Sequence, residues 1–375
     1  MHDLFPGYYV PTEEDIAKMW QDGIFVFDTN MLLHIYRYSP ETRERFFETL
    51  SRLRERIWIP YQVAYEYQDR RVAVISEQIR AYDVVAKLLD TVQQSLRSGL
   101  EPYKRRHAFI DPVKLTEEIT KAVSDAKSSV QKAKSEHPKY READPLRERI
   151  DELFNSRVGK PYTKDELEEK YQEAELRLER QIPPGLEDAD KKGLKKYGDV
   201  ILWFQLIDYA CAQKQPIIFI TDDVKKDWWL TSEESQGPIR PRPELLQEIY
   251  AEANVPFYMY QGYSFMEKAQ QFLKLEEKPE VIEEVKEVSQ QDEEDYQRQQ
   301  VEVTPKQTQF FFHCSRCGRN SMISAEYSQI TGEAREQIPT NVTCPYCNSI
   351  STLTIPDTWI SFSVTKINPI NLPSS

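Results

Sequence analysis

The first 275 residues alternate between short apolar runs and longer segments with helical periodicity. The apolar runs are five or six residues long, and we predict that they form buried strands, at 24–28, 56–60, 216–221 and 255–260. The periodic segments predict helices at 30–38, 40–55, 61–96, 195–213, 241–253 and 262–275. Strands that alternate with helices favour an α/β fold with a parallel sheet covered on both faces.

A long segment between the second and third predicted strands interrupts this alternation. We predict a helical insertion at about residues 72–190, whose second half is polar, charged and interrupted by prolines. The sequence leaves two alternatives for this insertion. It either packs only on itself, or it arches over a site and restricts which substrates enter.

The composition is typical of a soluble protein, with 39% hydrophobic and 30% charged residues. No apolar run approaches the roughly 18 residues that a membrane helix needs. The first residues, "MHDLFPGYYVPTEED", lack the basic start and the apolar core of a signal peptide. We therefore expect a cytoplasmic protein without membrane contact.

The net charge of −13 argues at first against a nucleic-acid partner, but this charge is unevenly distributed. Residues 275–303 carry 11 acidic and three basic residues, which account for more than half of the net charge. Such runs are usually solvated and flexible, so we predict an acidic flexible linker at 276–307. The charge of the remaining chain neither supports nor excludes nucleic acid.

Four of the five cysteines form two Cys-x-x-Cys pairs near the C-terminus: Cys314, Cys317, Cys344 and Cys347. Paired knuckles of this kind supply the four thiolates of a structural Zn²⁺ site, and redox chemistry is the alternative. Aromatic and β-branched runs flank both pairs, so we predict a β-rich zinc ribbon at 308–375 that binds nucleic acid or protein. His313 is expected to be a neighbour of the metal rather than a ligand.

Acidic residues recur where the predicted strands end or where nearby helices begin. Five carboxylates share this placement: Asp28, Glu66, Asp199, Asp222 and Asp223. In a doubly wound sheet the carboxyl ends of the strands meet at one edge, where ligands bind. Taken singly, the aspartates could instead cap helices, and Glu66 could form a surface ion pair.

Carboxylates that share a small space need cations to stay ionised together. Hard divalent ions such as Mg²⁺ accept oxygen ligands from one or two carboxylates each and keep several waters. A pair of such ions suits in-line phosphodiester cleavage, because one activates water and the other stabilises the leaving oxygen. The pattern therefore indicates a Mg²⁺ or Mn²⁺ site for phosphodiester hydrolysis.

Four segments resemble, in order, the acidic motifs of PIN-domain nucleases: "FDTNMLL", "IPYQVAYEYQDRR", "KKYGDVILWFQL" and "FITDDVKKDWW". The last two are similar to those of the PIN-like group with D-x-I-L-W and T-D-D-x-K-x-D-W motifs. The resemblance covers about residues 1–275. It implies a three-layer α/β/α sandwich that cleaves RNA, sometimes DNA, with Mg²⁺ or Mn²⁺. The long insertion departs from the compact domains of this family.

The resemblance also implies roles for individual residues. The metal ligands would be Asp28, Glu66, Asp199 and Asp223. Asn30 and Thr221 would be their polar companions at the catalytic site, and Asp222 is an extra carboxylate whose role stays open.

Basic residues near these motifs could contact the phosphates of a nucleic acid. They are Arg70, Arg71, Lys192, Lys195, Lys196, Lys225 and Lys226. For each of them a solvated surface charge is the alternative. Trp228 and Trp229 are expected in the core rather than stacked on bases.

The sequence thus predicts an endoribonuclease with one or two Mg²⁺ or Mn²⁺ ions, whose products carry a 5′-phosphate and a 3′-hydroxyl. RNA is the favoured substrate and DNA the second choice. An inhibitory or targeting protein partner, a homo-oligomer, and a role in toxin, defence or RNA-processing systems all stay open. The alternative is a non-catalytic PIN-like module that binds RNA or a protein. A phosphatase with a strand-end Asp-x-Asp is disfavoured, because Asn30 cannot serve as a general acid.

Overall fold

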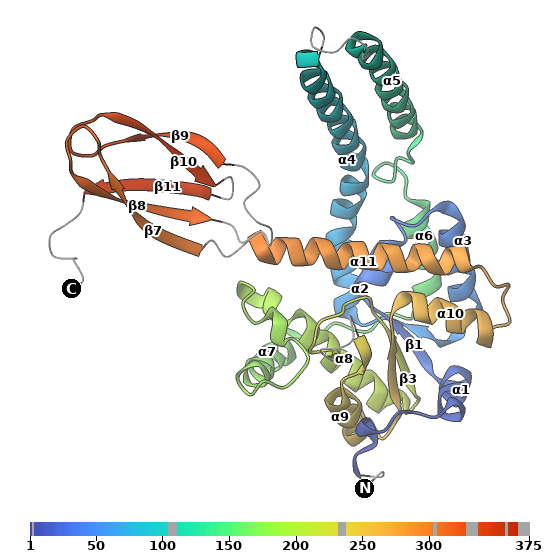
Figure 1. Ribbon diagram of the computed structural model, residues 1–375. Coiled ribbons are helices and arrows are strands. Elements are labelled where there is room, and N and C mark those ends of the chain that lie inside the picture. Colours follow the sequence, from blue (N-terminus) through green and yellow to red (C-terminus); the bar gives the residue numbers. More distant parts are fainter. Residues whose placement is uncertain are drawn as a thin grey trace. The chain divides into compact units, whose positions relative to one another are not determined.

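The computed structural model describes residues 1, 4–103, 111–231, 238–302, 306–327, 337–356 and 359–366. The chain divides into two compact units, Met1–Ser289 and Gln290–Ser375 (Figure 1). Of the described helices, none combines the length and the apolar character that a membrane span requires.

A four-stranded parallel sheet forms the centre of the first unit. Its strands lie in the order β2-β1-β3-β6, with bounds β1 Ile24–Phe27, β2 Ile57–Trp58, β3 Ile217–Ile220 and β6 Phe257–Tyr260. Every residue of β1 and β3 is buried, as expected for central strands covered on both faces. The predicted parallel sheet is confirmed, and each of the four predicted apolar runs contributes one strand.

Alternate side chains of these strands face two different helical layers. On one face Phe25 packs against Trp20 of α1, and Phe27 packs against Phe265 of α10, with ring centroids 4.9 and 5.4 Å apart. On the other face Phe257 packs against Trp203 of α8 at 5.4 Å. The helices that make these contacts are α1 Glu13–Asp22, α8 Gly198–Gln213 and α10 Gly262–Phe272. The predicted three-layer α/β/α sandwich is therefore confirmed.

Further helices and strands complete this sandwich. They are the helices α2 Thr29–His34, α3 Pro40–Arg52 and α9 Pro243–Ala253, and the strands β4 Trp229–Thr231 and β5 Pro238–Pro241. The helix α1 and the β4–β5 hairpin were not predicted. The hairpin strands are too short, and too rich in proline, to give a period-two pattern.

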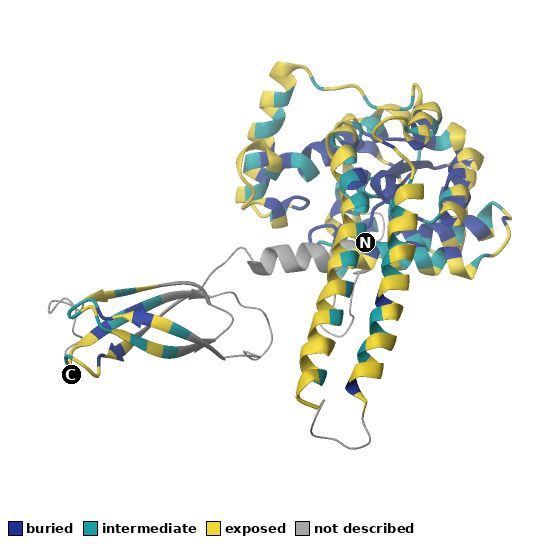
Figure 2. Cartoon of the chain, turned by 90° about the horizontal axis from the view of Figure 1, so that it is seen from above, coloured by how far each residue is buried: buried dark blue, intermediate teal, exposed yellow. Residues whose placement is uncertain are grey.

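The predicted insertion begins inside one continuous helix, α4 Tyr61–Leu100. The first third of α4 contributes buried residues to the core, and its remainder lies beside α5 Pro112–Glu136. Two ion pairs, Lys127–Asp90 at 2.6 Å and Lys134–Asp83 at 2.5 Å, link the two helices. This helical hairpin is largely exposed (Figure 2).

Other parts of the insertion pack on the sandwich. The helix α6 Pro145–Phe154 buries Leu146, Ile150 and Phe154 in the same core cluster as the sheet, and Phe27 contacts Phe154. The helix α7 Lys164–Glu179 contacts α8. The alternative in which the insertion packs only on itself is therefore wrong.

The acidic segment predicted as a flexible linker instead contains a long helix, α11 Pro279–Glu302. The beginning of α11 belongs to the first unit, because Val281 and Val285 are buried in its core. The carboxylate of Glu284 accepts hydrogen bonds from the hydroxyls of Ser39, at 2.7 Å, and Thr42, at 2.6 Å. Val281 and Val285 are four residues apart, which is a helical spacing, but the many acidic residues around them favoured a flexible segment.

The second unit consists of antiparallel strands. β7 Lys306–His313, β8 Asn320–Tyr327 and β11 Trp359–Lys366 form one sheet, and β9 Gln337–Thr343 pairs with β10 Ile350–Pro356. A small cluster of Phe312, Ile323 and Val342 with two cysteines is buried between them. The predicted β-rich zinc-ribbon architecture is confirmed.

Replacing Glu284 with alanine tests the attachment of α11. The substitution removes a carboxylate that accepts two side-chain hydrogen bonds at the start of α3, so we expect the free energy of unfolding to fall by about 1–3 kcal/mol. Urea denaturation of the full chain measures this change. Glu283→Ala, at an exposed neighbouring position, is the control and should change stability by less than about 0.5 kcal/mol. Equal effects of both substitutions would contradict the attachment.

Candidate active site

The candidate site begins at the carboxyl ends of β1 and β3. These strands pair in parallel with Phe27 opposite Ile220, so the next residues, Asp28 and Thr221, emerge side by side. Asp28 also caps α2, because its Oδ1 accepts a hydrogen bond from the Thr29 backbone N–H at 2.6 Å. The cap and the site are therefore not alternatives, since Oδ2 still points toward Thr221.

Asp28 Oδ2 lies among polar groups that the sequence had singled out. It accepts hydrogen bonds from the Thr221 hydroxyl at 2.6 Å and from the Asn30 amide at 3.0 Å. The Thr221 hydroxyl in turn accepts one from the Asp223 backbone N–H at 3.0 Å. Burial, followed by the negative charge of Asp199, raises the pKa of Asp28 despite these hydrogen bonds.

Glu66 lies in the second turn of α4 and joins the same group. Its Oε1 accepts a hydrogen bond from the Gln62 side chain at 2.7 Å, and its Oε2 lies 3.5 Å from the Thr29 hydroxyl. Gly198, at the start of α8, leaves room for this carboxylate, since a Cβ there would lie 3.2 Å from Oε1. Burial and then the charges of Asp28 and Asp199 raise the pKa of Glu66.

Asp199 and Asp223 share one ammonium group, that of Lys225. The Lys225 Nζ lies 2.9 Å from Asp199 Oδ2 and 2.9 Å from Asp223 Oδ2, and about a fifth of each carboxylate side chain is exposed. Burial raises the pKa of Asp223 to about 7, with Asp199 adding to the shift. Burial also works to raise the pKa of Asp199, but the Lys225 charge outweighs it and the pKa is lowered.

Asp222 faces away from the other carboxylates. Its Oδ1 accepts a hydrogen bond from the Gly262 backbone N–H at 2.7 Å, and its Oδ2 lies 3.2 Å from His34 Nδ1 in the buried interior. A Cβ at Gly262 would lie 2.9 Å from that Oδ2, so a side chain there would collide with this contact. The position of Asp222, which fixes the end of β3 against α2 and α10, removes it from the candidate catalytic set.

Two further carboxylates, which sequence reasoning missed, lie next to this group. Asp188 Oδ1 is 3.1 Å from Lys225 Nζ, and Asp227 Oδ2 accepts a hydrogen bond from the Gly185 backbone N–H at 2.6 Å. Asp227 lies in the same motif as Asp223, four residues further on, and this spacing could have identified it as a candidate. Nothing in the sequence around Asp188, at the end of the insertion, could have done so.

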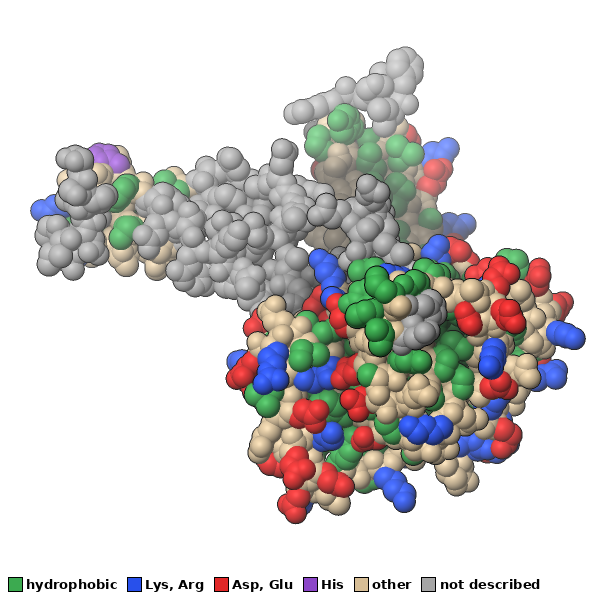
Figure 3. All heavy atoms as spheres, turned by 90° about the horizontal axis from the view of Figure 1, so that it is seen from below, with side chains coloured by type: hydrophobic (Ala, Val, Ile, Leu, Met, Phe, Trp, Pro, Cys, Tyr) green, Lys and Arg blue, Asp and Glu red, His purple; other side chains and the backbone are tan. Residues whose placement is uncertain are grey.

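The predicted phosphate-binding bases occupy different surroundings. Arg70, Lys192, Lys195 and Lys226 are exposed. Lys196 pairs with Glu175 at 2.6 Å. The Arg71 side chain is only 12% exposed and pairs with Asp144, and Lys225 is 10% exposed, so neither is a free surface base. On the face of the first unit seen in Figure 3, acidic and basic side chains are interspersed.

Both tryptophans of the last motif belong to the core, as expected. Trp228 and Trp229 are buried, and Trp228 packs against Phe219 with ring centroids 5.4 Å apart. The Trp229 indole N–H donates to the Asp223 backbone carbonyl at 2.6 Å. These contacts fix the loop after β3, which carries Asp223 and Lys225.

The carboxylate group fits a hard divalent cation. Its donors are oxygens, and burial, followed by the charges of neighbouring carboxylates, raises the pKa values of Asp28, Glu66 and Asp223. Among the described residues, the four cysteines are the group of three or more metal-binding side chains that could hold an ion by itself, with ligand atoms within 4.8 Å of one another. An ion at the carboxylates would be held by one or two of them and by water.

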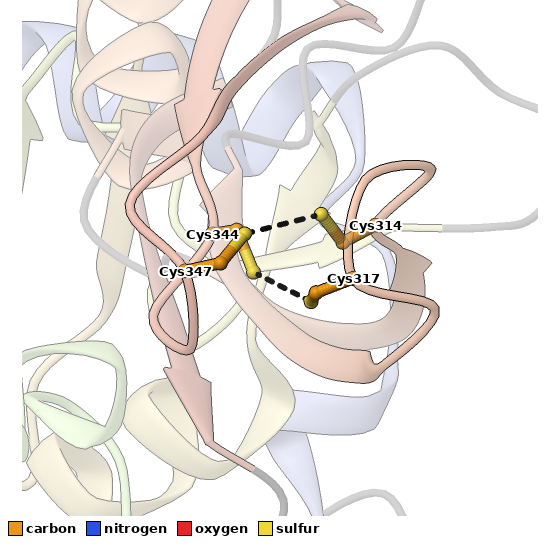
Figure 4. Close-up of side chains that lie close together, drawn as sticks. All are labelled: Cys314, Cys317, Cys344 and Cys347. Atoms are coloured by element: carbon orange, nitrogen blue, oxygen red, sulfur yellow. Dashed lines mark hydrogen bonds between the residues drawn. The ribbon is translucent and has the colours of Figure 1, made fainter.

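The four cysteines of the second unit come from two similar turns (Figure 4). The β7–β8 turn carries Cys314 and Cys317, and the β9–β10 turn carries Cys344 and Cys347. The sulfurs of Cys314 and Cys347 lie 3.8 Å apart, and those of Cys317 and Cys344 also lie 3.8 Å apart. In each turn the residue after the second cysteine has a positive φ, 69° at Gly318 and 56° at Asn348. This group could hold a metal ion. His313 instead contacts Asn320 at 2.8 Å, as a neighbour rather than a ligand.

Comparison with known proteins agrees with this geometry. The family model of the PIN like domain matches residues 24–245, which is more than half of the chain. No curated protein and no solved structure matches the chain. The matched segment begins at β1 and includes Asp28, Glu66, Asp199 and Asp223. The chain therefore belongs to the PIN-like domain family.

Proposed function

We propose that this protein is a metal-dependent nuclease that hydrolyses phosphodiester bonds, with RNA as the favoured substrate and DNA as the second. The observation that carries the proposal is the meeting of Asp28, Glu66, Asp199 and Asp223 at one edge of a parallel sheet, in a PIN-like domain. Membership of the family supports a nuclease in general. The preference for RNA and endonucleolytic cleavage go beyond it and are part of the proposal.

The carboxylates would hold one or two Mg²⁺ or Mn²⁺ ions. When bound, such ions activate water for attack on phosphorus and stabilise the leaving oxygen, which gives a 5′-phosphate and a 3′-hydroxyl. The chain's own residues keep the ligands in place. Thr221 and Asn30 orient Asp28, and Gln62 orients Glu66, by the hydrogen bonds described above.

Substrate phosphates would be contacted by the exposed bases of the candidate set, Arg70, Lys192, Lys195 and Lys226, with Lys196 beside them. Arg71 and Lys225 would not take this role, because Arg71 is paired with Asp144 and Lys225 with Asp188. The four cysteines would hold a structural Zn²⁺, and the ribbon would dock nucleic acid or a protein partner. A role in toxin, defence or RNA-processing systems is compatible with this activity.

Replacing Asp28 with asparagine tests the catalytic assignment. The substitution keeps the size of the side chain but removes its charge, so Mn²⁺-dependent cleavage of labelled RNA should fall by at least about 100-fold. Asp69→Asn, an identical change at an exposed position of α4, is the control and should retain activity. Equal cleavage by the wild type and Asp28→Asn would refute the site. No cleavage by any form would favour a non-catalytic module that binds RNA or a protein.

The raised pKa of Asp223 predicts how stability varies with pH when no divalent ion is present. The folded state keeps a proton on Asp223 up to about pH 7, whereas an unfolded aspartate loses it near its ordinary value of 3.8. Stability should therefore fall as pH rises between these values. Thermal melts in magnesium-free buffer at pH 5.5 and pH 8 measure this trend, and Asp223→Asn should weaken it. An identical pH trend in both proteins would contradict the assigned shift.

Zinc content tests the cysteine group. Elemental analysis of the purified full chain should give about one zinc per molecule, because four thiolates complete one tetrahedral site. Cys344→Ser should lose most of this zinc. Cys211→Ser is the matched control, since Cys211 lies in the first unit, and its zinc content should equal that of the wild type. Zinc retention in Cys344→Ser would overturn the assignment.

A further inference from the structure

Lys225 is enclosed by carboxylates on three sides. Its Nζ lies 2.9 Å from Asp199, 2.9 Å from Asp223 and 3.1 Å from Asp188. The contact with Asp199 is a hydrogen bond, and the contacts with Asp223 and Asp188 are ion pairs. Since only 10% of its side chain is exposed, Lys225 faces these carboxylates rather than a substrate phosphate.

The backbone around Lys225 is also fixed. Its own N–H donates to Asp223 Oδ1 at 3.0 Å. The next residue, Lys226, donates its backbone N–H to Glu187 Oε1 at 3.1 Å, and Asp227 accepts the Gly185 N–H at 2.6 Å. These two contacts hold the loop that ends the insertion against the loop after β3.

The loop at 185–188, which lies outside the four PIN-like motifs, places Asp188 next to Lys225. Gly185 begins the turn with φ of 98°, and a Cβ there would lie 2.6 Å from Val200 Cγ2, so the turn requires glycine. Asp188 follows in the short 3₁₀ helix Leu186–Asp188 and also pairs with Lys191 at 2.7 Å. A buried carboxylate is costly unless it is paired, and Asp188 is paired with both Lys225 and Lys191. Asp188 therefore helps to keep the Lys225 side chain in its position.

The two sides of the carboxylate group therefore differ. Asp199 and Asp223 already share a cation, whereas Asp28 and Glu66 form no ion pair with any residue that the structure describes. A divalent ion bound by both Asp199 and Asp223 would lie where the ammonium lies, and the two positive charges would repel each other. A divalent ion beside Asp28 and Glu66 meets no such obstacle.

We propose that Lys225 is a built-in cation that takes the place of a second divalent ion, so that the site binds a single Mg²⁺ or Mn²⁺ beside Asp28 and Glu66. The inference rests on the proposed function for the assignment of the carboxylates as ligands. It adds that Asp188 and the loop at 185–188 position Lys225. In this arrangement Lys225 is a positioning residue that supplies fixed positive charge at Asp199 and Asp223.

Counting bound Mn²⁺ tests the inference without reference to activity. Electron paramagnetic resonance of free Mn²⁺, titrated with the full chain in its zinc-loaded form, should give one bound ion per molecule. Lys225→Met removes the ammonium that Asp199 and Asp223 share, so the count should rise to two. Lys226→Met is the matched control, because that neighbouring side chain is exposed, and its count should stay at one.

Two ions in the wild type, or one ion of unchanged affinity in folded Lys225→Met, would overturn the inference and leave the proposed function intact. No Mn²⁺ bound by the wild type would instead overturn the proposed metal site itself. If Lys225→Met does not fold, Lys225→Arg replaces it. This variant keeps the charge and should bind one ion, whereas two ions would refute the role of Lys225.

Discussion

The parallel pairing of β1 with β3 brings together two parts of the candidate site that lie far apart in sequence. It places Phe27 opposite Ile220, and therefore places Asp28 beside Thr221 although 193 positions separate them in sequence. Both strands are fully buried, so a shift of this register would displace side chains that pack into the helices on both faces of the sheet. The hydrogen bond between Asp28 and Thr221 then follows from the position of the strand ends.

The candidate site buries several carboxylates close to one another. Burial raises the pKa values of Asp28, Glu66 and Asp223, and the protein tolerates this cost because the cluster lies at the edge of the sheet, with Asp199 and Asp223 partly exposed. The ammonium of Lys225 compensates the charges of Asp199 and Asp223 on one side of the cluster. The asymmetry between the two sides is what distinguishes this site from a simple ring of carboxylates around two equivalent ions.

The sequence predicted most of the sandwich because its signals are local. Apolar runs gave all four strands of the central sheet, and the acids at their ends gave four residues that interact electrostatically in the structure. What it could not give depends on contacts between distant segments. The role of Asp188 depends on a turn at the end of the insertion, and the interior position of Asp222 depends on Gly262 and His34. The helix α11 was missed because its acidic residues outweighed a weak apolar period.

We propose that the carboxylates at this sheet edge hold a divalent metal ion. Anomalous diffraction from crystals of the full chain soaked in Mn²⁺ tests it most directly, because Mn²⁺ is identified by its own scattering and located independently of activity. We expect an anomalous peak in contact with Asp28 and Glu66, with Lys225 still paired to Asp199 and Asp223. A Mn²⁺-soaked crystal with no peak at these carboxylates would contradict it.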